Sequence, residues 1–224
     1  MNLLLVHFVI SIVLLIILFF LSRHTTNQLF YFLRHFFTHD KTVFNIIAFI
    51  FFPGTVLHEL AHFFAAIILF LRVRDLKVFP EWKDDYLKLG HVLYERKDFF
   101  RGFLVGIAPI FAGLLFFLLI FVWKLFPNQN LLINLLLIYL IFTVSSTMFS
   151  SKQDLKDLVY IPPLLVLLYG IIYVFDIKLE LIFRNNALLQ TLISFITQIN
   201  FFLVLSLTIH VGTVVLIRIL LRRK

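Results

Sequence analysis

Long apolar runs separated by short polar segments dominate this chain. Six runs come close to the twenty or so residues that a helix needs to cross the roughly 30 Å apolar core of a bilayer. They cover residues 3–21, 43–71, 102–126, 131–149, 158–175 and 200–221. Ser22, Arg23 and His24 follow the first run without a small-residue cleavage site, so we interpret this run as a retained span. The pattern predicts an all-α polytopic membrane protein of about six transmembrane helices, forming one domain over residues 1–224.

Residues 72–101 form the one long polar segment between the runs. Leu76 and Val78, and then Leu87 and Leu89, alternate with polar residues on either side of Lys83-Asp84-Asp85. Such alternation around a polar turn is typical of two short strands in a hairpin. We therefore expect a β-hairpin at the membrane surface after the second span, with a solvated connector as the alternative. Residues 186–199, just before the last run, are expected to form an interfacial helix.

The composition excludes several classes of protein. Hydrophobic residues make up 62% and charged residues 14%, against about 45–50% and 25% in soluble domains, and the mean hydropathy is +1.03. A soluble globule and a disordered chain are thereby excluded. The absence of cysteine excludes a disulfide scaffold, iron–sulfur clusters and cysteine-bound zinc. Because no basic stripe is interleaved with aromatic residues, we expect no nucleic-acid partner despite the net charge of +8.

The positive charges lie mainly on one side of the predicted spans. Six spans put both termini on the same side, together with residues 72–101 and the segment around Lys152 and Lys156. This side carries fourteen of the twenty Lys and Arg residues. Because positive residues stay in the cytoplasm, we expect both termini to be cytoplasmic.

The second run contains the sequence His58-Glu59-Leu60-Ala61-His62. Residues four apart lie on one face of a helix, so both imidazoles can bind one zinc ion, at about 2.0–2.1 Å. Zinc lowers the pKa of a coordinated water to about 7, and Glu59 is placed to act as its general base. An ionisable residue inside a span costs about 2.5–3.5 kcal/mol, so we expect a metal here. A hydrogen-bonded histidine pair in the bundle core is the alternative, and a haem site is a weaker one.

A hydrolytic zinc site uses a third protein ligand. Asp154 lies just past the fourth run, on the same side as the end of the second, and would have to reach inward on a re-entrant segment. Ser151 and Asp154 also fit a helix capping box, which is the structural alternative. Asp157 and His91 are further candidate ligands.

An HExxH motif inside a transmembrane helix, followed by a later aspartate, resembles the site-2 protease family of intramembrane zinc metalloproteases. The likeness is to its small bacterial branch, the peptidase M50B-like proteins, in which Pro53-Gly54 shortly before the motif is also familiar. The resemblance implies that His58, His62 and Asp154 bind zinc and that Glu59 is the general base. It further implies a hairpin after the motif, a membrane-protein substrate with a transmembrane segment, and a place in the lipid bilayer of a bacterial cytoplasmic membrane.

The chain also departs from that family. Better-known members carry the third ligand in an Asp-Gly pair preceded by Asn and Pro, and this sequence has no Asp-Gly. Residues 108–113, Ala-Pro-Ile-Phe-Ala-Gly, are a candidate counterpart of the substrate-holding segment, without its Asn. A second hypothesis is therefore a non-proteolytic, zinc-containing membrane protein that binds or chaperones other membrane proteins. A metal transporter is disfavoured, because the predicted spans contain essentially no carboxylate besides Glu59.

Overall fold

The computed structural model describes residues 2–83, 86–88, 90–95, 97–149 and 186–222, and the single residues 167, 170 and 174. This part of the chain is mostly helical. Its helices are α1 (Asn2–Phe36), α2 (Asp40–Ile68), α3 (Phe99–Val122), α4 (Leu131–Thr147) and α8 (Asn186–Arg222). Its strands are β1 (Val73–Lys77), β2 (Glu81–Lys83), β3 (Tyr86–Lys88) and β4 (His91–Tyr94).

Within the described ranges, four helices are long and apolar enough to cross a membrane: α1, α2, α3 and α8. The prediction of a mostly helical chain is thereby confirmed, and these four helices are candidate membrane spans by their length and composition. The fourth predicted span forms α4, an apolar helix of 17 residues. Almost all of the fifth, 158–175, lies outside the described residues, so the count of six spans stays a prediction.

Two helices extend beyond the predicted spans. The polar residues after Leu21 do not end α1. The hydroxyls of Ser22, Thr25 and Thr26 donate to carbonyls three or four residues back, so these polar groups are satisfied within the continuing helix. Residues 186–199 were expected to form an interfacial helix leading into the last span, and they are continuous with it in α8. In both helices, the backbone stays helical through the polar residues that lie next to the apolar run.

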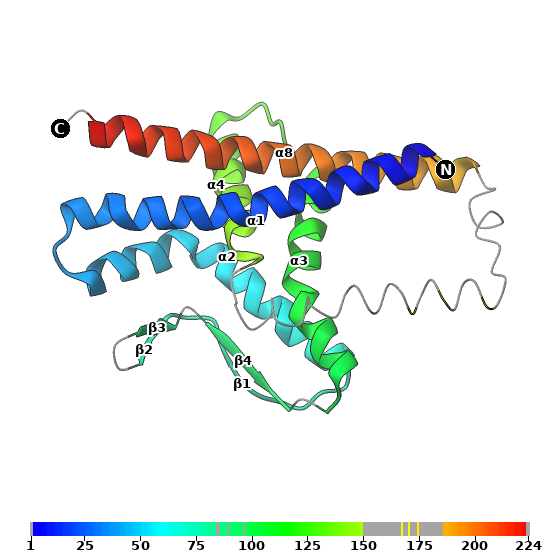
Figure 1. Cartoon of the computed structure of the whole chain (residues 1–224), viewed down its shortest axis with the longest axis horizontal. Helices are drawn as coiled ribbons and strands as arrows, with labels where there is room; N and C mark the ends of the chain where they lie inside the picture. Colours follow the sequence, from blue (N-terminus) through cyan, green and yellow to red (C-terminus); the bar gives the residue numbers. More distant parts are fainter. Residues whose placement is uncertain are drawn as a thin grey trace.

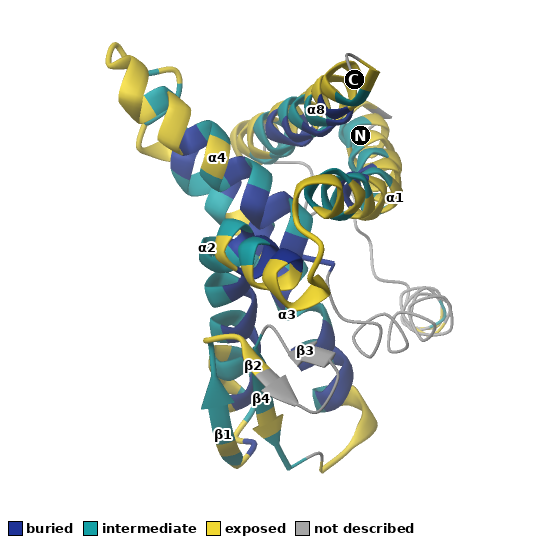
Figure 2. Cartoon of the chain, turned by 90° about the vertical axis from the view of Figure 1, so that its left-hand side faces the viewer, coloured by how far each residue is buried: buried dark blue, intermediate teal, exposed yellow. Residues whose placement is uncertain are grey.

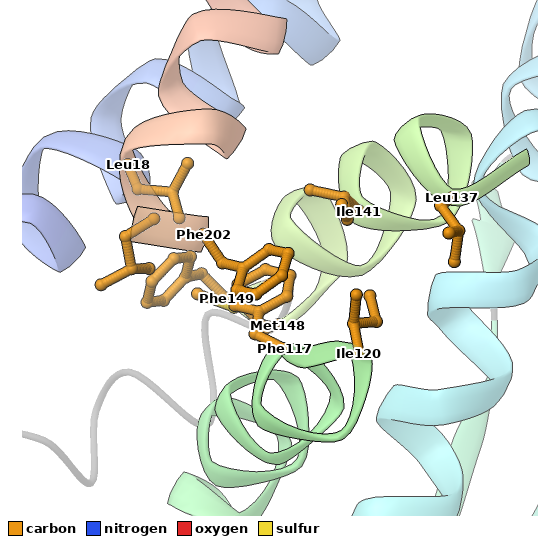
Figure 3. Packing of buried hydrophobic residues seen from close by; sticks show 9 residues of the cluster. Leu18, Phe117, Ile120, Leu137, Ile141, Met148, Phe149 and Phe202 are labelled. Atoms are coloured by element: carbon orange, nitrogen blue, oxygen red, sulfur yellow. The ribbon is translucent and has the colours of Figure 1, made fainter. Parts of the chain in front are cut away.

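Helices α1 and α8 run side by side in the same direction and cross α3 and α4 (Figure 1). Ser11 donates to the side-chain oxygen of Asn200 at 2.7 Å, and the Asn200 amide donates to the carbonyl of His7 at 3.0 Å. Where the pair meets α3 and α4, Phe117 stacks on Phe202, with ring centroids 5.9 Å apart (Figure 3). These contacts form the largest apolar core among the described residues.

The polar segment after α2 forms the predicted hairpin. Strands β1 and β4 are antiparallel, with Lys77 opposite His91, and farther along the hairpin β2 and β3 pair with Lys83 opposite Tyr86. The hairpin lies along α2 (Figures 1 and 2), since Phe79 stacks on Phe52 with ring centroids 5.3 Å apart. The chain thus turns back at the end of α2 and covers the same helix that carries the HExxH motif.

Helix α4 crosses α2 at Gly54, directly after the helix proline Pro53. A side-chain carbon at Gly54 would collide with the main-chain carbonyl of Thr143 and would lie 2.5 Å from Oγ1 of Thr147. The hydroxyl of Tyr139 fastens the same crossing by donating to the carbonyl of Ile50 at 2.8 Å. The C-terminal half of α4 is therefore held one turn before His58.

Replacing Gly54 with alanine is expected to destabilise the protein by about 1–3 kcal/mol, because the added methyl group meets main-chain atoms that cannot rotate away. Gly212→Ala in α8 is the matched control, since nothing lies within 4 Å of its added carbon. Alanine is the better helix former, so this control is expected to be neutral or stabilising. Thermal unfolding in detergent measures both. Equal shifts in the two variants would contradict the close crossing.

Candidate metal centre

The histidines of the HExxH motif converge as their spacing predicts. His58 and His62 lie one turn apart on the buried face of α2, and their Nε2 atoms are 3.1 Å from each other. The rings are nearly perpendicular, with centroids 4.6 Å apart. Two nitrogen ligands in a tetrahedral zinc site stand about 3.3 Å apart, so the pair fits zinc with little movement.

The position of His62 is fixed by helix α3. Its Nδ1 lies 2.8 Å from the carbonyl oxygen of Val105. Because a carbonyl only accepts hydrogen bonds, Nδ1 carries the proton and Nε2 keeps the lone pair that a metal needs. Histidine ligands of metals typically donate their other ring N–H to a carbonyl or carboxylate in this way.

The carbonyl of Val105 can accept that bond because of a proline in α3. In a regular helix the N–H of residue 109 would bond to the carbonyl of residue 105, but Pro109 has no N–H. The carbonyl therefore lacks its helical donor and is available to a neighbouring helix. His62 on α2 supplies the missing bond. One proline thus links the packing of α2 and α3 to the orientation of a candidate ligand.

Glu59 lies in the same turn and is buried beneath the hairpin. A side-chain carbon at Gly90 would lie 2.7 Å from Cγ of Glu59 and 3.0 Å from its Oε1. Only glycine lets the chain entering β4 come this close without moving the carboxylate. The arrangement holds the candidate general base next to His58 and covers it on one side.

The predicted third ligand is not placed by the structure, because both of its aspartate candidates, Asp154 and Asp157, lie outside the described residues. Among the residues that are described, no three His, Cys, Asp or Glu side chains gather as a metal site would require. His91, the remaining candidate, directs its Nε2 to the carboxylate of Asp75 at 3.3 Å. The structure therefore brings together His58, His62 and Glu59 and leaves the completion of the site a prediction.

Another buried histidine, His210 on α8, lies outside this centre. Its Nε2 is 3.2 Å from the hydroxyl of Ser145 on α4, and its ring packs against Phe142 with centroids 5.0 Å apart. It joins α8 to α4. Because it is buried but lies away from His58 and His62, its replacement can serve as a control for replacement of either of them.

Sequence reasoning missed two contributors to the site, Val105 and Gly90, and gave Pro109 another role, as part of the candidate substrate-holding segment 108–113. Pro109 carried a usable signal, because a proline inside an apolar helix frees the carbonyl four residues earlier. The identity of the donor could not be found in this way, because it depends on how α2 and α3 pack. Gly90 gave no signal beyond being a glycine in a polar segment.

Comparisons with protein-family models, with curated proteins and with solved structures find no match to this chain. Its function therefore has to be inferred from its own residues.

Pro109→Ala is expected to weaken zinc binding about tenfold, the lower end of what loss of an outer-shell partner costs. The new N–H at position 109 competes with His62 for the carbonyl of Val105. Competition with a chromogenic zinc chelator measures the affinity in detergent.

The matched control removes the other helix proline. Pro53→Ala restores an N–H to the carbonyl of Phe49, whose side chain is exposed, and it should leave zinc affinity unchanged. Equal weakening in both variants would assign the effect to helix bending and not to the Val105 carbonyl.

Proposed function

We propose that this protein is an intramembrane zinc metalloprotease that hydrolyses peptide bonds in or near transmembrane segments of other membrane proteins. The observation that carries the proposal is the convergence of the His58 and His62 Nε2 atoms to 3.1 Å on the buried face of an apolar helix. The bond from His62 to Val105 adds to it, because it leaves Nε2 free of a proton. The adjacent Glu59 completes the set that zinc peptidases use.

Asp154 is the proposed third ligand. Helix α4 ends at Thr147, whose hydroxyl oxygen lies beside Gly54, one turn before His58 on α2. Seven further residues lead from Thr147 to Asp154, and an extended chain of that length reaches about 23 Å. The carboxylate is therefore within reach of the histidine pair.

Bound zinc would supply a Lewis acid that polarises a peptide carbonyl and makes water a stronger acid. The chain itself supplies proton transfer. Glu59 accepts a proton from the attacking water and passes it to the nitrogen of the breaking peptide bond, which leaves as an amine. Burial of Glu59 beside the two histidines keeps this carboxylate close to the reacting atoms.

The hairpin is proposed to hold the substrate. A helical substrate hides its backbone groups and must unwind before cleavage. Strands β1 and β4 pair only with each other among the described strands, as do β2 and β3, so each pair has outer edges to which an extended peptide can add. Gly90 brings this platform into contact with Glu59.

The proposal includes the topology and family expected from the sequence. From the sequence we keep about six spans, a bacterial cytoplasmic membrane, zinc as cofactor and a transmembrane protein as substrate. The predicted placement of both termini in the cytoplasm does not fit the parallel course of α1 and α8, which puts the two ends of the chain at opposite ends of this helix pair (Figure 1). The likeness to site-2 proteases, in the peptidase M50B-like branch, supports the same assignment through the HExxH motif and the later aspartate.

A second candidate is a zinc-containing membrane protein that binds or chaperones other membrane proteins without cleaving them. The cover of Gly90 over Glu59 favours it, because the carboxylate is closed off on that side. The two candidates differ in whether Glu59 is needed for activity.

Purified protein in detergent is expected to contain about one zinc ion per chain, measured by plasma emission spectrometry. His58→Ala and Asp154→Ala should each lose it, since each removes a ligand. Asp157→Ala should keep it, as should His210→Ala, which removes a buried histidine outside the centre. Absence of zinc from the wild type after exposure to zinc would overturn the proposal. If Asp157→Ala lost its zinc while Asp154→Ala kept it, the third ligand would be Asp157 and not Asp154.

Glu59→Gln is expected to keep zinc and to lower cleavage by about 10²–10⁴-fold, because the amide cannot accept the proton of water. Membrane-protein fragments from cells producing the wild type or the variant, compared by mass spectrometry, provide the measurement. An identical fragment pattern together with full biological activity of Glu59→Gln would favour the non-proteolytic candidate.

A further inference from the structure

The junction between α2 and α3 is the place where two candidate membrane spans end within a short distance of each other. Helix α2 ends in a Schellman motif: Leu71 N–H donates to the carbonyl of Ala66, and Phe70 N–H to that of Ile67. Phe70 adopts φ 55°, a left-handed conformation that glycine usually fills. Helix α3 begins after Asp98, which caps the N–H of Arg101 at 2.8 Å. A junction between two spans lies at the surface of a membrane.

An open cleft of about 430 Å³ lies at this junction, at the base of the hairpin. Arg72, Val73, Arg74 and Glu95 line it. Glu95 accepts two hydrogen bonds from Arg74, at 2.8 and 3.0 Å. That bond, with the charges of Arg74, Arg72 and Lys97, lowers the pKa of Glu95. Three cations therefore act on one carboxylate.

Two of these cations are not neutralised by the protein. Arg74 is paired with Glu95, and the neighbouring Arg101 is paired with Asp98. Arg72 and Lys97 have no carboxylate partner among the described residues, and Lys97 donates only to the carbonyl of Phe70 at 3.5 Å. The cleft is thus lined by two arginines and one carboxylate, Lys97 adds a further positive charge beside it at Phe70, and its volume leaves room for an anion.

An apolar rim adjoins these cations. Phe70 is 84% exposed, and Ile68, Phe99 and Phe100 are exposed as well. A bulky side chain that is both exposed and in a left-handed conformation gains nothing from the protein core. It gains from contact with acyl chains, and phenylalanine beside basic residues is typical of segments that lie in the membrane interface.

We propose that Arg72 and Lys97 bind the phosphate of an anionic phospholipid, whose acyl chains contact Phe70, Phe99 and Phe100. A free phosphate ion would satisfy the cations and leave the apolar rim in water. A zwitterionic lipid brings its own cation to the phosphate and so competes with the two side chains. An anionic phospholipid satisfies both the charge and the rim.

The experiment titrates detergent-purified protein with phosphatidylglycerol or with phosphatidylcholine of the same acyl chains, and counts bound lipid by native mass spectrometry. The wild type should retain phosphatidylglycerol in preference. Each basic residue near an anionic surface contributes about fivefold in binding, so the double variant Arg72→Gln/Lys97→Gln should bind roughly 25-fold more weakly. Glu95→Gln, which releases Arg74 from its partner, should bind about fivefold more tightly.

Lys124→Gln is the matched control. Lys124 follows the opposite end of α3, so this variant removes one positive charge, as each half of the double variant does, at a place away from the cleft. It should bind as the wild type does. Equal weakening in this control, equal retention of phosphatidylcholine, or displacement of the lipid by millimolar inorganic phosphate would overturn the proposal. Because Glu95→Gln acts in the opposite direction, a folding defect cannot produce the expected pair of results.

Discussion

The hydrogen bond from His62 to the carbonyl of Val105 is the contact on which the candidate site depends. An apolar helix cannot leave an imidazole N–H unsatisfied without cost, and the neighbouring apolar helix has no side chain placed to accept it. Pro109 resolves this by removing the donor that would otherwise occupy the carbonyl. The same bond locks α2 to α3, fixes the protonated nitrogen of His62 and turns the other nitrogen toward His58. Packing and ligand geometry are therefore set by a single interaction.

Helix α4 is held against its neighbours by close contacts at two glycines, as α3 is held against α2 by this hydrogen bond. At Gly54 on α2, the absence of a side chain leaves space for the main chain of Thr143. At Gly113 on α3, an added side-chain carbon would lie 2.8 Å from the sulfur of Met148. Dispersion forces and small residues drive helix association in a membrane, where water provides no hydrophobic force between helices. The end of α4 is held between α2 and α3 by these contacts. The end of α4 consequently lies at Gly54, one turn before His58 on α2.

Helical periodicity made the convergence of His58 and His62 predictable from the sequence, because a four-residue spacing determines a face without reference to tertiary structure. The alternation around Lys83 similarly predicted the hairpin. What the sequence could not supply was the pairing of distant segments: that Val105 would meet His62, or that Gly90 would lie against Glu59. The full lengths of α1 and α8 were not predictable from the apolar runs either, because a helix can continue beyond the apolar residues that define a predicted span.

The hairpin covers the carboxylate of Glu59, which lies next to the histidine pair. Its described carboxylates have basic partners: Glu81 lies beside Lys77, Glu95 beside Arg74, and Asp75 beside the imidazole of His91. Such pairing lowers the cost of laying a charged ribbon along an apolar helix. The ribbon reaches Glu59 only because position 90 has no side chain, and it then shields the carboxylate from water on that side. In the proposed mechanism, a peptide approaching from the same side would have to displace the chain at Gly90 before it reached Glu59. Access to this carboxylate would then be coupled to movement of the hairpin and not to His62, which the carbonyl of Val105 on α3 holds in place.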